Sequence, residues 1–251
     1  MDIELLAIMG RGIQQMPYPI IDPTKVRDWT LTDNLEVCDV NSAHLAVQVP
    51  VDDDNPYCMV GGGWLNIKAG VRLVDMQHTR IVVCAYGHRS DYLASIGAPS
   101  ESEVMSQQFM EHILRVNNEE LWRPSFPEVV VWERTRTLPG PSNTGQELRN
   151  IFDLALERGL RKIAIVTVGV HVPRTATYVS KLLSVHERYR ELHPMVLESE
   201  EVLLRSYEAL RPDFETLRAS QSFARNWARE ADGIQKIVRD VYGDNKPKVV
   251  T

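Results

Sequence analysis

The stretch KIAIVTVGVHVPRTATY, residues 162–178, predicts a buried strand, a tight turn and a helix in direct succession. From Ile163 to Val168 the chain is mostly β-branched and almost continuously apolar, which is typical of a strand buried on both faces of a parallel sheet. Gly169 permits a sharp turn, and Pro173 suits the first helical position, where a missing N–H group costs nothing. Ligands of open α/β sheets usually bind at this end of a strand.

Two polar side chains follow this strand. His171 falls in the turn, and Arg174 falls in the first helical turn, where a cation opposes the helix dipole by about 0.3 to 1 kcal/mol. No acidic residue lies between Thr175 and Tyr178, so either a ligand phosphate or a carboxylate from elsewhere would satisfy Arg174. The alternative interpretations are a solvated surface arginine and a hydrogen-bonded loop histidine.

The bulk composition favours a globular chain of one large domain, or of one domain with a small appendage. Its 251 residues, 43% hydrophobic and 25% charged, suffice for one large α/β domain with a substantial core. The net charge is −6 and no Lys/Arg-rich block occurs, so we expect no nucleic-acid partner. No apolar run approaches 18 residues, so we expect no membrane span. The start, MDIELLAIMG, is acidic and unlike a signal peptide, so we expect a cytoplasmic location.

The cysteines predict neither disulfides nor a metal site. Cys38, Cys58 and Cys84 are odd in number, widely spaced and set in or beside apolar runs. This pattern favours reduced core thiols in a cytoplasmic protein. No spacing of His, Cys or acidic residues resembles a ligand set, so no metal is predicted.

The order of elements predicts a Rossmann-like α/β domain. Helices and strands alternate from Tyr57 to about Arg190, which favours a parallel sheet with helices on both faces. We assign residues 1–194 to this domain, with 13–56 as an inserted or extended β-rich segment, and residues 195–251 to a C-terminal helical extension that packs on it. A long helix after Pro212 carries an apolar stripe for packing on the domain or on a second subunit, which leaves a homo-oligomer open. The stripe comprises Leu217, Ala224, Trp227, Ala231, Ile234, Val238 and Val241.

A glycine turn follows the first predicted strand, Ile3 to Met9. Gly10-Arg11-Gly12 is able to cradle a phosphate, but Gln15 replaces the third glycine of the dinucleotide-binding fingerprint. The turn is therefore a candidate ligand-binding segment and not a complete motif.

A second glycine run, which ends in Gly62 and Gly63, precedes a helix with Asn66 in its first turn and Arg72 deeper inside. The run either wraps an anion or serves close packing of a strand on the helix. We include these four residues among the candidate ligand-binding positions.

Two sequences predict capping boxes at helix N-termini. Ser100 with Glu103, and Thr144 with Glu147, each fit the S/T-x-x-E pattern. Capping alone is a sufficient role for Glu103. A further acidic residue, Glu133, comes at the carboxyl end of the strand predicted for residues 128–132.

The order of these polar signatures resembles a known family. The signatures are Ser102-Glu103 at one helix start, Glu133 after a strand, Ser142-Asn143-Thr144 with Glu147 at the next helix, and Val166-Thr167 through His171 to Pro173-Arg174. This succession is similar to the domain family of unknown function 218 (DUF218, or YdcF-like), which includes the SanA and ElyC envelope proteins. The resemblance covers about residues 57–183 and the first strand. The departures are Val104 for the usual alanine, Val168 for serine and Gly145-Gln146-Glu147 for aromatic-Glu-Asn, and the transmembrane anchor is missing.

The resemblance implies a Rossmann-like fold and a pocket of charged residues with an enzymatic purpose. It also implies S-adenosylmethionine, which one member binds, as a candidate cofactor. Under this hypothesis the catalytic residues are His171, Glu133, Glu103 and Arg174. The ligand-binding residues are Gly10, Arg11, Gly12, Gly62, Gly63, Asn66, Arg72, Ser142, Asn143, Thr144, Glu147 and Thr167.

These residues favour an enzyme that acts by hydrolysis or group transfer on a small anionic metabolite, phosphorylated or nucleotide-like. Helix N-termini and Arg174 would hold the charge, and His171 with a carboxylate would move a proton. Two alternatives stay open: a non-catalytic module that binds S-adenosylmethionine or a nucleotide, and an envelope-biogenesis factor. The G-x-S-x-G elbow of a serine nucleophile is missing.

Overall fold

The computed structural model describes residues 2–15, 22–31, 35–36, 46–47, 62–76, 79–87, 91–119, 126–132 and 143–239. Within these residues, five parallel strands form one sheet in the order β7-β6-β1-β8-β9. Their bounds are β1 (Ile3–Ile8), β6 (Thr79–Cys84), β7 (Glu128–Val130), β8 (Lys162–Thr167) and β9 (His193–Glu198). The predicted parallel sheet and the strand at 162–168 are therefore confirmed.

The strand order reverses at β1. After β1 the chain forms β6 and β7 on one side of β1, and it then forms β8 and β9 on the other side. At the carboxyl end of β1, Ile8 is in register with Cys84 of β6 and with Val166 of β8. The segments that follow β1 and β8 diverge at this reversal, which is where ligands of doubly wound sheets bind.

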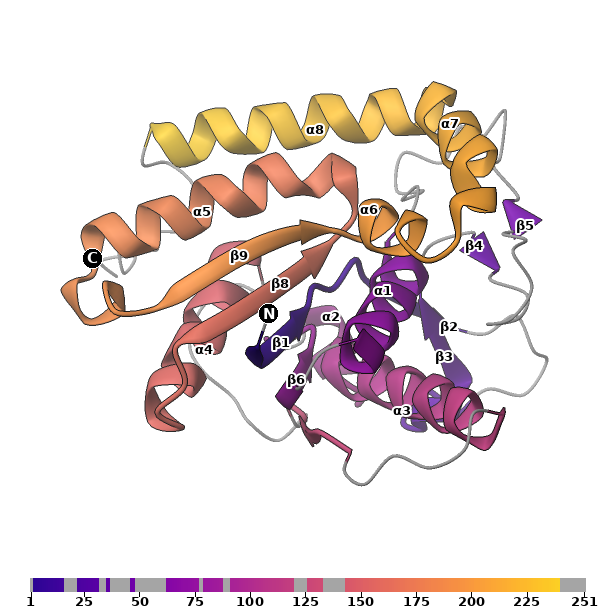
Figure 1. Ribbon diagram of the computed structural model, residues 1–251, viewed down its shortest axis with the longest axis horizontal. Coiled ribbons are helices and arrows are strands. Elements are labelled where there is room, and N and C mark those ends of the chain that lie inside the picture. Colours follow the sequence, from indigo (N-terminus) through magenta and orange to yellow (C-terminus); the bar gives the residue numbers. More distant parts are fainter. Residues whose placement is uncertain are drawn as a thin grey trace.

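Helices cover both faces of the sheet (Figure 1). They are α1 (Gly63–Met76), α2 (Asp91–Ser95), α3 (Glu101–Glu119), α4 (Thr144–Glu157), α5 (Val172–Val185), α6 (Ser199–Leu204), α7 (Arg211–Ala219) and α8 (Gln221–Val238). Side chains of β1 alternate between the faces: Leu6 and Ile8 join a core with α1 and α3, whereas Leu5 and Ala7 join a core with α4 and α5. This arrangement confirms the Rossmann-like α/β fold class.

Short elements complete the description. They are β2 (Ile13–Gln15), η1 (Val26–Asp28), β3 (Trp29–Leu31), β4 (Leu35–Glu36), β5 (Ala46–Val47), η2 (Gly169–His171), η3 (Glu187–Tyr189) and η4 (Glu208–Leu210). β2 pairs with β3 and β4 with β5, both antiparallel, within the segment predicted to be β-rich. The strand predicted from Tyr57 lies outside the described residues.

One predicted capping box is confirmed and the other is wrong. At the start of α3, Ser100 N–H donates to Glu103 Oε2 at 2.6 Å and Glu103 N–H donates to Ser100 Oγ at 3.1 Å. At the start of α4, Asn143 is the cap and its Oδ1 accepts from Gln146 N–H at 3.0 Å. Thr144 is already helical, because the better-placed amide one residue earlier satisfies the helix end, and Glu147 is released for other contacts.

The predicted long C-terminal helix is two helices, and most of its apolar stripe does not pack on the domain in α8. Packing of the stripe on a second subunit stays a prediction, and Val241 lies outside the described residues. Ser220 ends α7 and caps α8 by accepting from Phe223 N–H, so the chain forms two helices. The residues that α8 buries are Asn226, Glu230, Gly233 and Ile237, whereas Ala224, Trp227, Ala231 and Val238 are exposed. Figure 1 shows α8 running alongside α5, on which it packs.

None of the helices in the described part of the chain has both the length and the apolar composition needed to cross a bilayer. The buried core instead divides between the two faces of the sheet. Cys84, at the end of β6, is a buried free thiol, and burial raises its pKa to about 12.

Candidate functional site

The loop after β1, which contains Gly10, Arg11 and Gly12, forms one part of the candidate site. Gly12 has φ +99°, a conformation that favours glycine. A Cβ atom on Gly10 would lie 2.5 Å from Glu101 Oε1, and one on Gly62 would lie 2.7 Å from Cγ of Arg11. The glycines therefore permit a carboxylate and the Arg11 side chain to lie directly against the loop backbone.

Three side chains converge on one carboxylate at the point where the strand order reverses. Arg11 Nη1 lies 3.1 Å from Glu230 Oε1, and His171 Nδ1 and Arg174 Nε lie 2.8 and 3.2 Å from Glu230 Oε2. Arg11 follows β1, His171 and Arg174 follow β8, and Glu230 comes from α8. The side chains of Arg11, His171 and Glu230 are 3%, 3% and 7% exposed, so the cluster is almost free of solvent.

Thr144 extends this cluster to the start of α4. Arg174 Nη2 donates to Thr144 Oγ1 at 2.9 Å, and the same oxygen lies 3.4 Å from His171 Nε2. An ionised Glu230 only accepts hydrogen bonds, so the contact at Nδ1 assigns the imidazole proton to that nitrogen. Nε2 then carries a lone pair and accepts from the Thr144 hydroxyl.

The charges in the cluster fix the ionisation of both partners. Burial lowers the pKa of His171 and, with the guanidinium charges of Arg11 and Arg174, outweighs the hydrogen bond and the charge of Glu230, which raise it. Burial opposes ionisation of Glu230, but the hydrogen bond from His171 and the two guanidinium charges outweigh it and hold its pKa low. At neutral pH Glu230 is therefore an anion and His171 is a neutral imidazole.

A pair of carboxyl groups lies on the other side of the same loop. Glu101 Oε1 accepts from Gly12 N–H at 2.5 Å, and Glu147 Oε1 accepts from Gly10 N–H at 3.4 Å. Burial raises the pKa of both groups, and the like charge of Glu101 helps to raise that of Glu147 to about 8. Glu147 is therefore a protonated acid at neutral pH.

A fourth buried carboxyl group, that of Glu200, supports the turn that carries His171. Glu200, at the start of α6, accepts from Gly169 N–H at 2.9 Å. Burial and the nearby charge of Glu198 raise the pKa of Glu200 to about 7. Its place beside the backbone of η2 indicates a role in holding that turn.

We predict that Glu147→Gln makes the protein more stable than the wild type at pH 8 and not at pH 5. The folded-state pKa of Glu147 exceeds its usual 4.5, so its contribution to stability is complete below about pH 4.5 and is lost as pH rises towards 8. A tenfold difference in proton affinity between the folded and unfolded chains corresponds to about 1.4 kcal/mol. Glutamine mimics the protonated acid and does not ionise.

The measurement is denaturant unfolding at both pH values. Glu157→Gln, at the exposed end of the same helix, is the matched control and should leave the pH dependence unchanged. If Glu147→Gln loses stability between pH 5 and pH 8 as steeply as the wild type, the raised pKa assigned to Glu147 is wrong.

The structure brings many of the predicted residues together around the loop after β1. His171, Arg174, Arg11 and Thr144 contact one another directly or through Glu230, and Glu147 reaches Gly10. Gly12 and Gly62 border the same loop, and Asn143 caps the helix that carries Thr144. Glu133 and Ser142 lie outside the described residues.

Other predicted residues have structural partners away from the cluster. The Glu103 carboxylate caps α3. Asn66 donates to Met9 O at 2.8 Å and accepts from Ser199 Oγ.

Arg72 pairs with Asp75 and donates to Ser206 Oγ, and a Cβ on Gly63 would meet Leu31. Thr167 is buried at the end of β8, and its hydroxyl has no hydrogen-bond partner among the described residues.

Two central residues were missed by the sequence analysis. Glu230 has no local signal, since its partner Arg11 is 219 residues away and it sits among exposed positions of an amphipathic helix. Glu101 had a signal, because residues 100–103 contain two Ser-Glu pairs. The carboxylate of the first pair reaches the β1 loop, whereas that of the second caps the helix.

Within the described ranges, no group of three or more His, Cys, Asp and Glu side chains is arranged to hold a metal ion. The donors that surround Glu230 are guanidinium and imidazole groups, which suit an anion. Comparisons of the chain with protein-family models, with curated proteins and with solved structures found no match. The similarity to the YdcF-like family therefore stays a prediction from motifs.

Proposed function

We propose that this protein is an enzyme that acts by hydrolysis or group transfer on a small anionic metabolite, phosphorylated or nucleotide-like. The observation that carries the proposal is the convergence of Arg11, His171 and Arg174 on one point at the reversal of the strand order. In doubly wound sheets this position is the usual ligand site.

A buried guanidinium group, that of Arg11, and a partly buried one, that of Arg174, require negative charge where they meet. An unpaired charge that is removed from water is very costly, and here a carboxylate meets the requirement. The planar N–H donors of arginine match the oxygens of phosphate as well as those of carboxylate. A ligand phosphate held by Arg11 and Arg174 would also meet Nδ1 of His171 and lie near the start of α4.

The ionisation states supply an acid and a base on either side of the loop. His171 has a lowered pKa and is a neutral base at neutral pH, whereas Glu147 has a raised pKa and is a protonated acid. Opposite pKa shifts of two titratable groups in one site are the usual basis of acid–base assignments. In this proposal Arg174 and Arg11 neutralise charge that develops on the transferred group.

A ligand panel tests the proposal. Thermal shift with inorganic phosphate, phosphate esters, nucleotides and S-adenosylmethionine identifies the ligand class, and hits are then assayed for turnover. We expect phosphorylated compounds to stabilise the wild type and Arg174→Met to lose that response. Arg190→Met, an exposed arginine that pairs with Glu187, is the control and should keep it.

The outcomes separate the candidate functions. Turnover of a bound phosphorylated compound supports the enzyme. Binding of S-adenosylmethionine or a nucleotide without turnover supports the binding module, and a response unaffected by Arg174→Met contradicts the site.

A further inference from the structure

The carboxylate at the centre of the cluster belongs to a peripheral helix. α8 packs on α5, on η2 and on α7, at the outside of the fold (Figure 1). Glu230 nevertheless reaches the loop after β1, where it meets Arg11, a residue from the opposite end of the chain. This outer helix therefore places one carboxylate against the loop that follows the central strand.

The side of α8 that faces the site is mainly polar. Asn226 and Glu230 are buried at successive turns, with Gly233 one turn further on, and apolar anchoring is confined to Phe223 and Ile237 near the two ends. Trp227 is 49% exposed and stacks with Phe223.

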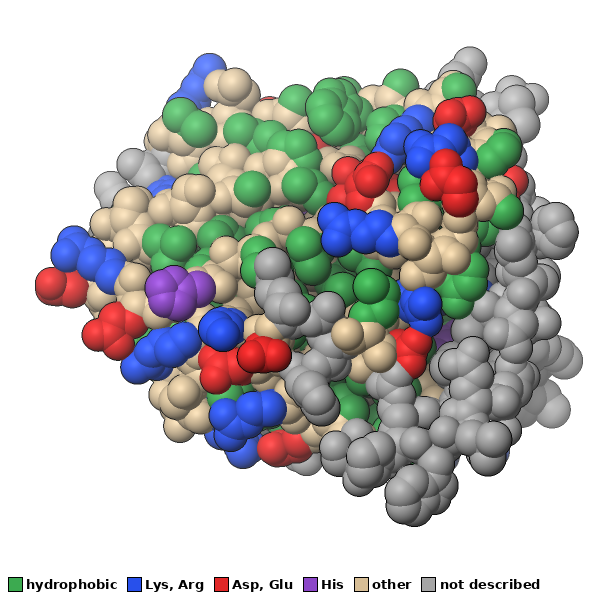
Figure 2. Space-filling model, in the orientation of Figure 1, with side chains coloured by type: hydrophobic (Ala, Val, Ile, Leu, Met, Phe, Trp, Pro, Cys, Tyr) green, Lys and Arg blue, Asp and Glu red, His purple; other side chains and the backbone are tan. Residues whose placement is uncertain are grey.

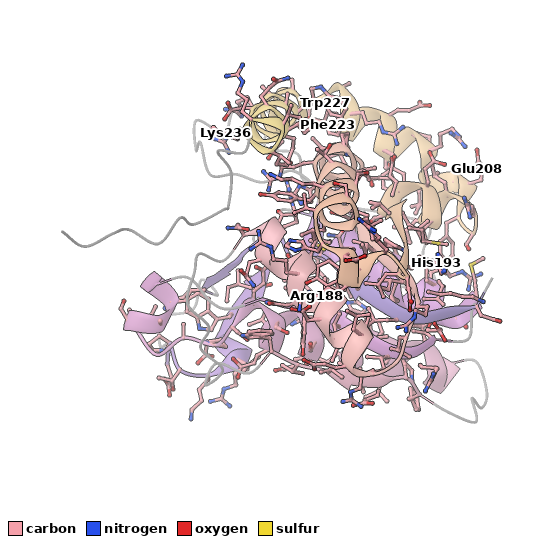
Figure 3. The ribbon with its side chains drawn as sticks, turned by 90° about the vertical axis from the view of Figure 1, so that its left-hand side faces the viewer. Arg188, His193, Glu208, Phe223, Trp227 and Lys236 are labelled. Atoms are coloured by element: carbon pink, nitrogen blue, oxygen red, sulfur yellow. The ribbon has the colours of Figure 1, made fainter. Side chains whose placement is uncertain are left out.

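Figure 2 shows hydrophobic side chains on the surface over α8. Figure 3, almost end-on to this helix, labels Phe223 and Trp227 on one side and Lys236 on the other. A helix docked by apolar burial turns its apolar side inward, whereas the middle of α8 is held by charge.

The contacts of Glu230 leave no room for a ligand at the same atoms. Its two oxygens lie 2.8 to 3.2 Å from donor atoms of Arg11, His171 and Arg174. A Cβ atom on Gly233 would lie 2.8 Å from Cδ of Arg174, so the helix also packs closely over that side chain. A phosphate group therefore reaches these donors only when Glu230 withdraws.

We propose that Glu230 occupies the position at which the anionic group of the ligand binds, so that ligand binding displaces Glu230 and the part of α8 that carries it. We call α8 in this role the strap. This inference rests on the proposed function, because it assumes that Arg11, His171 and Arg174 bind the anion. A phosphate dianion carries more charge and more acceptor oxygens than a carboxylate, so it is able to replace Glu230. Glu230 competes with the ligand for the same donors from within the same chain. The apparent affinity for the ligand is therefore the affinity of the form in which Glu230 has withdrawn, multiplied by the fraction of molecules in that form.

Calorimetric titration of inorganic phosphate tests the strap. We expect Glu230→Gln, which removes the charge but keeps the size, to bind phosphate at least tenfold more tightly than the wild type. Asp232→Asn is the matched control, since it removes one charge from the exposed side of the same helix, where Asp232 pairs with Lys236. The control should bind phosphate like the wild type.

A second measurement uses the wild-type protein and does not depend on the stability of the variant. Saturating phosphate should speed amide hydrogen exchange in α8 around residues 226–233 while it slows exchange in the loop after β1. Unchanged or slower exchange in α8 would overturn the strap.

The two proposals fail in different ways. Equal phosphate affinity of the wild type and Glu230→Gln, lost in both after Arg174→Met, would overturn the strap and leave the anion site standing. No binding of phosphate by either protein would overturn both.

Discussion

Replacing Arg11 with methionine is expected to lower the free energy of unfolding by about 3 to 5 kcal/mol, because it leaves a buried carboxylate without one of its charge partners. The Arg11 side chain is 3% exposed and lies 3.1 Å from Glu230, which is itself almost fully buried. Guanidinium denaturation at pH 7 measures the loss. Arg27→Met, in an arginine whose side chain is 80% exposed, should change stability by less than about 0.5 kcal/mol.

A double-mutant cycle separates the pair from general damage to the fold. Arg11→Met combined with Glu230→Gln should be about 1 to 3 kcal/mol more stable than the sum of the single changes predicts, since the second change removes the stranded charge. Additive effects, within about 0.5 kcal/mol, would show that the two side chains do not depend on each other.

His171→Ala is expected to lower kcat/KM for the substrate found in the panel by about 100- to 10,000-fold, the usual contribution of an acid–base group. The imidazole is held between Glu230 and Thr144, and its neutral form is available at neutral pH. His193→Ala, in an exposed histidine at the start of β9 (Figure 3), is the control and should keep full activity.

The pH profile of the wild type adds an independent check. In the proposed mechanism His171 is neutral and Glu147 is protonated, so kcat/KM should fall above about pH 8, as Glu147 ionises, and at acid pH, as His171 gains a proton. Glu147→Gln should have a lower kcat/KM than the wild type, because glutamine cannot donate a proton. The kcat/KM that remains should not fall above about pH 8. Full activity of His171→Ala would remove this histidine from the mechanism.

Local patterns were enough to predict the framework. The apolar run at 162–168 specified β8, the alternation of elements specified a parallel sheet, and Ser100 with Glu103 specified the cap of α3. The strand and the cap are each decided within a few residues, and the parallel sheet follows from the order in which such local patterns succeed one another.

The rest of the site depends on contacts that no local pattern encodes. Sequence pointed to His171 and Arg174 and left open whether a ligand or a distant carboxylate satisfies the arginine; in this structure the carboxylate is Glu230. Apolar periodicity does not mark the side of α8 that packs on the domain, because that side carries Asn226 and Glu230, and the carboxylate of Glu230 pairs with residues far away in the sequence. The cap of α4 was misassigned for a related reason, since Asn143 already satisfies that helix end.

The stacking of Trp227 on Phe223 gives the molecule an internal optical reporter. The indole lies one helical turn before Glu230 and is about half exposed, so its emission wavelength should respond to any change in how α8 is solvated. Stopped-flow fluorescence would therefore time the proposed departure of α8 after the protein is mixed with phosphate, and substitution of Trp227 by phenylalanine would identify its part of the signal.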